Sequence, residues 1–174
     1  MAITMTVKKG SGSGNFEPGW KQVKANKAAY GSLENGAKYI DVWFEGYPEN
    51  FNLRMYAKTN KDGEEFAIAN LFRFANAGIQ EVVDSQSNSD VIVKIDDSAA
   101  NLVGQEFWIY LYKNEEGYSR VLQRIAPTEF DGSLDTFTES DVNYWKGRAE
   151  QYFNEWVKPN IGSSTMEKTD SAPF

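Results

Sequence analysis

The sequence predicts a mainly β protein, a five-stranded antiparallel barrel with one helix between the third and fourth strands. Short segments of alternating apolar and polar residues recur between residues 20 and 125, with turn residues between them. After three such segments, residues 64–77 change to a helical period, and further strand segments follow. The predicted divisions are a flexible arm at 1–15, a barrel domain at 16–126, a linker and C-terminal amphipathic helix at 127–160, and a disordered tail at 161–174.

The first three strands are expected at residues 20–30, 38–45 and 51–57, joined by turns that contain glycine. The arm before them carries a Gly-Ser repeat at 10–14, which is typical of a flexible segment. Because successive side chains of a strand point to opposite faces, alternate residues should share the barrel interior. The residues expected inside are Val23, Ala25, Ile40, Val42, Phe44, Leu53 and Met55. The opposite faces of the second and third strands mix aromatic and charged side chains.

A largely buried helix is expected at residues 64–77, where a broad apolar band would pack on the sheet and Gly78 would end the helix. Residues 84–90 read as a polar loop and residues 91–95 as a short strand. The Asp-Asp-Ser sequence at 96–98 is a helix-start signal, and it predicts a single helical turn before the next strand.

The fourth main strand, at residues 107–112, is apolar or aromatic on both faces. One face would carry Phe107, Ile109 and Leu111, and the other Trp108, Tyr110 and Tyr112. A sheet with one solvated side normally has a polar residue at every second position, so the three rings are either covered by another element or available to a partner. A turn leads to the last strand, at 118–125. One of its faces would carry Tyr118, Arg120, Leu122 and Arg124.

This order of elements is typical of the oligonucleotide/oligosaccharide-binding (OB) barrel, whereas a plain β-sandwich would not need the helix. After the barrel, residues 140–158 present one apolar helical face, and the sequence Lys158-Pro159 is expected to end that helix. The face consists of Val142, Trp145, Ala149, Tyr152 and Trp156. It either packs on the barrel of its own chain or contacts another subunit, which would make the protein a homo-oligomer.

Composition narrows the classes of function. The chain has 174 residues and contains neither cysteine nor histidine, so thiolate chemistry, Cys or His metal sites and Ser-His nucleophiles are excluded. We therefore expect a protein that is not an enzyme and holds no cofactor or metal. No apolar run is long enough to span a membrane, and no signal peptide is visible, so a cytoplasmic protein is expected.

The net charge of −7 is unevenly distributed. Residues 1–60 hold eight Lys or Arg against five Asp or Glu, and the remaining residues hold ten against twenty. One face of the sheet can therefore be locally positive in a chain that is acidic as a whole.

Several segments carry a family resemblance. They are the first strand opening after Gly19-Trp20, the second strand Lys-Tyr-Ile-Asp-Val-Trp-Phe from residue 38, the helix at 66–74 ending in Ala77-Gly78-Ile79, and the turn Leu102-Val103-Gly104 before the aromatic strand. In these features residues 20–126 resemble the small single-stranded-DNA-binding proteins encoded in the replication regions of tailed phages. The resemblance implies sequence-tolerant binding of single-stranded DNA in phage DNA replication or recombination, in the cytoplasm of the host cell.

The tail adds a second resemblance. It ends Asp170-Ser171-Ala172-Pro173-Phe174, and bacterial single-stranded-DNA-binding proteins are similar in ending on an acidic segment closed by Pro-Phe. This tail departs from that pattern because only Glu167 and Asp170 are acidic and Lys168 lies between them. The resemblance implies that Asp170, Pro173 and Phe174 contact replication or recombination proteins.

A general binder of single-stranded DNA stacks bases on aromatic rings, at about 1–3 kcal/mol per base, and holds phosphates with Lys or Arg. The candidate platforms are Tyr39, Trp43, Tyr56, Trp108, Tyr110 and Tyr112. The candidate phosphate contacts are Lys24, Arg54, Lys113 and Arg120. For each ring, packing in the core is the alternative role, and it applies most to the two tryptophans.

Two other functions fit parts of the sequence. A carbohydrate-binding module would also stack sugars on tyrosine and tryptophan, with Asp41 or Glu45 binding hydroxyl groups. A metal-dependent nuclease would use Asp90, Lys94 and the Asp96-Asp97 pair. That set lacks the acidic-x-Lys spacing of such sites, and a helix cap explains Asp96-Asp97 more simply.

Overall fold

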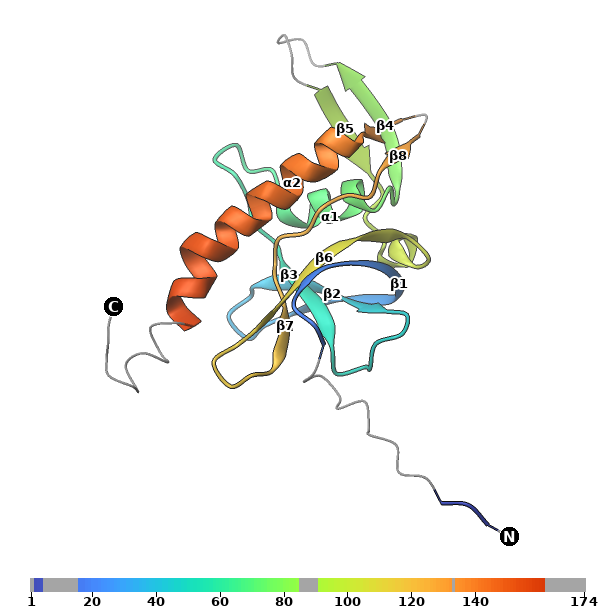
Figure 1. Ribbon diagram of the computed structural model, residues 1–174. Helices are drawn as coiled ribbons and strands as arrows, with labels where there is room; N and C mark the ends of the chain where they lie inside the picture. Colours follow the sequence, from blue (N-terminus) through green and yellow to red (C-terminus); the bar gives the residue numbers. More distant parts are fainter. Residues whose placement is uncertain (1, 5–15, 85–90, 133, 162–174) are drawn as a thin grey trace.

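Five antiparallel strands form a nearly closed barrel in the computed structural model, in the order β3-β2-β1-β6-β7 (Figure 1). The structure describes residues 2–4, 16–84, 91–132 and 134–161. The barrel strands are β1 (Gly19–Ser32), β2 (Lys38–Phe44), β3 (Asn52–Tyr56), β6 (Glu106–Lys113) and β7 (Ser119–Val121). The predicted mainly β fold and its five-stranded, OB-like barrel are confirmed.

The long strand β1 gives the barrel its curvature. Its first half pairs with β6, from Gly19 opposite Leu111 to Lys24 opposite Glu106, and its second half pairs with β2. The register shifts between Ala25 and Lys27, which is a bulge, and bulges bend a strand and increase its twist. One continuous segment therefore belongs to both sides of the barrel.

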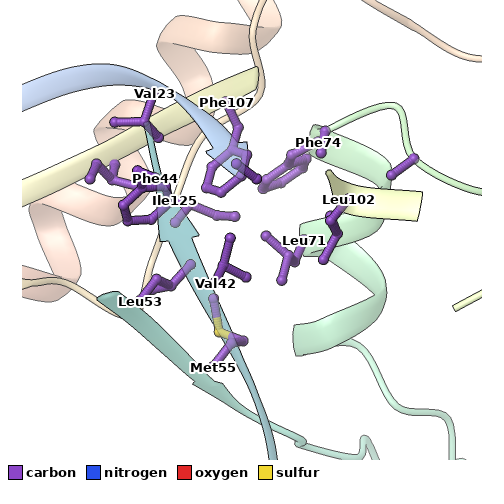
Figure 2. Packing of buried hydrophobic residues seen from close by; sticks show 14 of the residues in the cluster. Val23, Val42, Phe44, Leu53, Met55, Leu71, Phe74, Leu102, Phe107 and Ile125 are labelled. Atoms are coloured by element: carbon purple, nitrogen blue, oxygen red, sulfur yellow. The ribbon is translucent and has the colours of Figure 1, made fainter. Parts of the chain in front are cut away.

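The predicted interior residues form the core. Phe107, Ile109 and Leu111 are completely buried, so the register expected for the aromatic strand is confirmed. Val23, Ala25, Ile40, Val42, Phe44, Leu53 and Met55 are also buried. Figure 2 shows Leu71 and Phe74 of the helix α1 (Ala67–Phe74) reaching toward Val42 and Phe107. Helix α1 thus covers the core between the third strand and the aromatic strand.

Helix α1 is shorter than the residue range 64–77 predicted for it. Its first backbone N–H groups are capped by the Glu65 carboxylate, which accepts hydrogen bonds from the amides of Ala67, Ile68 and Ala69 at 2.8–2.9 Å. The chain leaves the helix after Phe74, because Asn76 has a positive φ of 54°. The buried residues Ile68, Leu71, Phe72 and Phe74 confirm the apolar band.

Two hairpins were not predicted. Strands β4 (Ile79–Asp84) and β5 (Val91–Ile95) form a separate two-stranded sheet, which projects away from the barrel beyond α1 (Figure 1). Strands β8 (Phe130–Asp131) and β9 (Thr136–Phe137) form another within the predicted linker. The ion pair of Arg73 with Asp135, at 2.9 Å, ties this second hairpin to α1. The predicted helical turn is confirmed as the short 3₁₀ helix η2 (Ala99–Leu102).

The last barrel strand ends earlier than expected. Strand β7 stops at Val121, and the chain then re-forms a bridge to β6 at Ala126, opposite Trp108. The intervening residues leave the strand alternation, so Leu122 is buried rather than sharing the outer face with Arg120. The prediction of one continuous face over residues 118–125 was therefore wrong.

The C-terminal helix packs on its own barrel. Helix α2 (Glu139–Tyr152) begins with a capping box between Thr138 and Asp141 and continues through the π-helical segment η3 (Phe153–Val157) to residue 161. Pro159 does not end it, contrary to the prediction, and the π turns lie just before this residue, which has no backbone N–H for the ladder. Trp156 is 66% exposed and does not join the buried face. No helix in the described residues is long and apolar enough to cross a membrane.

Candidate nucleic-acid interface

The outer face of β1, β2 and β3 carries three rows of side chains across the strands. Tyr39 of β2 lies between Gly31 and Tyr56, and Trp43 lies between Lys27 and Asn52. The middle row consists of Ala29, Asp41 and Arg54. We call the outward side chains of these rows the β2–β3 face. Its aromatic members, Tyr39, Trp43 and Tyr56, are half-buried.

The far end of the Tyr39 ring lies over Gly31 of β1. A Cβ atom at Gly31 would come within 2.6 Å of the far end of this ring, so the glycine makes room for it. The Tyr56 ring meets Tyr39 edge to face, with a centroid distance of 5.8 Å. The Arg54 guanidinium lies 3.8 Å from the Tyr39 centroid. Tyr39 is therefore held by contacts that fix its orientation.

Arg54 is oriented by a two-pronged ion pair. Its Nε and Nη2 atoms donate to the two carboxylate oxygens of Asp41 at 2.8 and 2.9 Å. The hydrogen bonds to Asp41 raise the pKa of Arg54, so its charge is permanent. Asp41 is buried, with 11% of its side chain exposed, whereas 38% of the Arg54 side chain is exposed. The accessible charge of this pair is therefore the cation.

Trp43 is held at the other end of the face. Its indole Nε1 donates to the backbone carbonyl of Glu49 at 2.8 Å, and the Lys27 ammonium lies 4.3 Å from its ring. Lys27 also pairs with the exposed Glu49 carboxylate at 3.0 Å. Both ends of the face thus combine an aromatic ring with a cation.

The rings of the aromatic strand have a different environment. Trp108, Tyr110 and Tyr112 point out of the barrel as predicted, but α2 and η3 lie over them. The Lys146 ammonium lies 3.5 Å from the Trp108 centroid, and the Phe153 ring lies 5.3 Å from both tyrosine rings. The sequence left open whether these rings are covered by another element or available to a partner. In the structure, the C-terminal helix covers them.

A fourth ring belongs to this covered set. Trp20 of β1 meets Tyr110 at 5.1 Å, and its Nε1 donates to the Glu150 carboxylate at 2.6 Å. Burial lowers the pKa of Lys146, and the negative charge of Glu150 partly offsets this lowering. Burial also raises the pKa of Tyr110. These directions agree with a helix that removes the outer rings of β6 from water.

The other predicted residues lie apart from the β2–β3 face. Lys24 points outward from β1 but lies opposite Glu106 of β6, and Arg120 lies opposite Tyr112 at the barrel edge. Lys113 ends β6. The tail residues Asp170, Pro173 and Phe174 lie outside the described residues, as do residues 5–15 of the arm.

The residues of the nuclease hypothesis have other partners. Lys94 pairs with Glu81 across the β4–β5 hairpin at 3.4 Å. Asp96 accepts hydrogen bonds from the amide and hydroxyl groups of Ser98, which lower its pKa, as a turn-forming residue would. Asp90 lies outside the described residues. The described part of the chain contains no group of three or more acidic residues placed to hold a metal ion.

Sequence reasoning missed Lys27 and the strip of the C-terminal helix formed by Lys146 and Glu150 of α2 and Phe153 of η3. These three residues are spaced four and three positions apart, beside the predicted apolar face. Because two of them are charged, a search for hydrophobic periodicity does not detect them. Lys27 follows the bulge in β1, which changes the face of every later residue.

No protein-family model matches the chain, and no curated protein matches it significantly. Any functional conclusion therefore depends on the geometry of this chain.

Proposed function

We propose that this protein binds single-stranded DNA without strong sequence preference, and that the β2–β3 face is its binding surface. The observation that carries the proposal is the alignment of Tyr39, Tyr56 and Trp43 on one outer face, with Arg54 and Lys27 against the rings. Unpaired bases stack on such rings, and the two cations meet the phosphates between them. No chemical step is required of the protein.

The β2–β3 face suits this role better than the aromatic strand does. The rings of the β2–β3 face contact the sheet and the turn between β2 and β3. On β1 their neighbours are the small residues Ala29 and Gly31. On β6, the rings of Trp108 and Tyr110 already contact α2 and η3. We therefore assign the β6 rings to the docking of the C-terminal helix.

The arrangement of Asp41 favours DNA over a neutral sugar. A sugar site would use carboxylate oxygens to accept hydrogen bonds from hydroxyl groups, but both Asp41 oxygens accept from Arg54. The exposed partner is the guanidinium, which suits a phosphate. The two ligand classes also differ in salt dependence, since phosphate binding releases counterions and neutral-sugar binding does not.

The test is the affinity of the protein for fluorescently labelled oligo-dT, measured by anisotropy over a series of salt concentrations. We expect binding at low salt that weakens linearly on a logarithmic scale as salt rises, with a slope of about 0.7 per phosphate contact. Oligosaccharides of matched length should not compete. Binding that is absent at low salt, or unaffected by salt, would overturn the proposal.

A further inference from the structure

A groove runs along the open seam of the barrel. Strands β3 and β7 are the two ends of the strand order, so within the described residues no hydrogen-bonded strand pair closes the seam between them. The groove there has a volume of about 570 Å³ and lies between α1, the C-terminal helix and residues 123–125. Met55 of β3 forms its inner wall.

The groove exposes aromatic rings. Phe66, before α1, is 42% exposed, and Trp156 of the C-terminal helix is 66% exposed, although both are large apolar side chains. Tyr152 lies between the helix and the seam and is half-buried. Single exposed rings are ordinary on a protein surface. Here the rings of Phe66, Tyr152 and Trp156 line the same groove.

The same groove carries cations without carboxylate partners. Arg124 lies 3.9 Å from the Tyr152 ring centroid, and Arg148 is exposed at the groove wall. Within the described residues, neither arginine forms an ion pair with a carboxylate. Lys58 lies near Arg124, and burial together with the charge of Arg124 lowers the pKa of Lys58. Arg124 and Arg148 outnumber Glu155, the one carboxylate among the described residues that line the groove, so the charge of the groove favours an anion.

The groove and the β2–β3 face share the strand β3. Tyr56 is the last residue of β3 and belongs to that face, whereas its neighbour Met55 points to the groove. Lys58 follows Tyr56 by two residues along the chain, and the charge of Arg124 acts on it. Single-stranded DNA that crosses the Tyr39 and Tyr56 rings is therefore directed toward Lys58 and then Arg124.

We propose that the seam groove is a second segment of the single-stranded DNA path, reached from the β2–β3 face over the edge of β3. Bases stack on Phe66 and Trp156, and phosphates contact Lys58, Arg124 and Arg148. The inference rests on the proposed function, which it deepens by extending the site around the barrel. Short strands occupy the β2–β3 face alone, and longer strands occupy both segments.

The test compares oligo-dT lengths from about 4 to about 16 nucleotides, the range of site sizes reported for one barrel. The groove variant is Trp156→Ala with Arg148→Gln, both exposed side chains, so the fold should be preserved. The matched control is Tyr118→Ala with Lys94→Gln, which removes another exposed ring and another positive charge outside the groove. Circular dichroism and urea unfolding verify that both variants fold.

We expect the groove variant to bind the shortest oligonucleotides like the control and to bind the longest at least about five-fold more weakly, the lower end of what one base stack contributes. The salt slope for the longest should fall by about 0.7. Equal affinities of the groove variant and the control at every length would overturn the proposed DNA path through the groove. A loss in the groove variant that is the same at every length would overturn it too. Wild-type protein that binds no length would instead overturn the proposed function itself.

Discussion

The Lys146 ammonium lies 3.5 Å from the centroid of the Trp108 ring, closer than any other cation to a ring in the described residues. With the Glu150–Trp20 hydrogen bond and the Phe153 ring, this contact fixes the C-terminal helix across β1 and β6. The outer rings of β6 therefore have a structural role that their strand sequence does not reveal.

Phe153→Ala tests this role. It removes the ring that packs against Tyr110 and Tyr112, so we expect the free energy of unfolding to fall by about 1–3 kcal/mol, since the site is only half-buried. Urea unfolding measures this loss. Because the β6 rings are not the proposed DNA site, oligo-dT affinity should stay unchanged. A clear rise in affinity would show that the helix instead covers a DNA-binding surface.

Gly31→Ala tests the β2–β3 face without changing any of its polar or aromatic residues. The added Cβ would lie 2.6 Å from the far end of the Tyr39 ring and should displace this ring from the sheet. We expect oligo-dT affinity to fall by roughly three- to ten-fold, a fraction of one base stack. Gly147→Ala is the matched control, since nothing lies within 4 Å of its Cβ position, and it should leave affinity unchanged. Loss of affinity in both variants would contradict this account.

Asp41→Asn distinguishes DNA from carbohydrate. The substitution keeps the shape of the side chain but removes the negative charge beside Arg54. We expect oligo-dT to bind several-fold more tightly at low salt, because one carboxylate next to the phosphates is gone. The unfolding free energy should fall by about 1–3 kcal/mol from the weakened ion pair. A carbohydrate site that uses Asp41 would lose affinity instead, and anisotropy titration separates the two results.

Glu65→Ala separates stability from binding. The Glu65 carboxylate accepts hydrogen bonds from the first amides of α1, and loss of a helix cap costs about 0.5–2 kcal/mol. Thermal or urea unfolding should show this loss. Glu65 does not belong to the β2–β3 face, so affinity for short oligo-dT at a temperature where the variant is folded should match the wild type. A large loss of affinity would show that the position of α1 controls the face.

The sequence is sufficient to predict the barrel because its strands alternate cleanly and its interior residues are apolar. Ile40, Val42 and Phe44 could be assigned to the core on period alone, and the structure buries all three. The same alternation placed Tyr39 and Trp43 outside. These predictions follow from local geometry, which a single sequence contains.

The errors arose where distant segments determine the structure. The period of the last strand continues to residue 125, but the bridge of Trp108 to Ala126 ends the alternation early. Pro159 usually ends a helix, yet π turns precede it and the helix continues. The covering of Trp108 depends on Lys146, a charged residue that no hydrophobic pattern selects. Tertiary packing decides each of these features.

The most direct test of the central claim is tryptophan fluorescence during titration with a short oligo-dT that occupies the β2–β3 face alone, in the wild type and in Trp43→Phe. Trp43 is the tryptophan on the β2–β3 face, whereas Trp20 and Trp108 lie beneath the C-terminal helix. We predict quenching of the wild type at low salt, its reversal at high salt, and loss of most of the quenching in Trp43→Phe. Quenching that is absent in the wild type, or fully retained in Trp43→Phe, would contradict binding of DNA on this face.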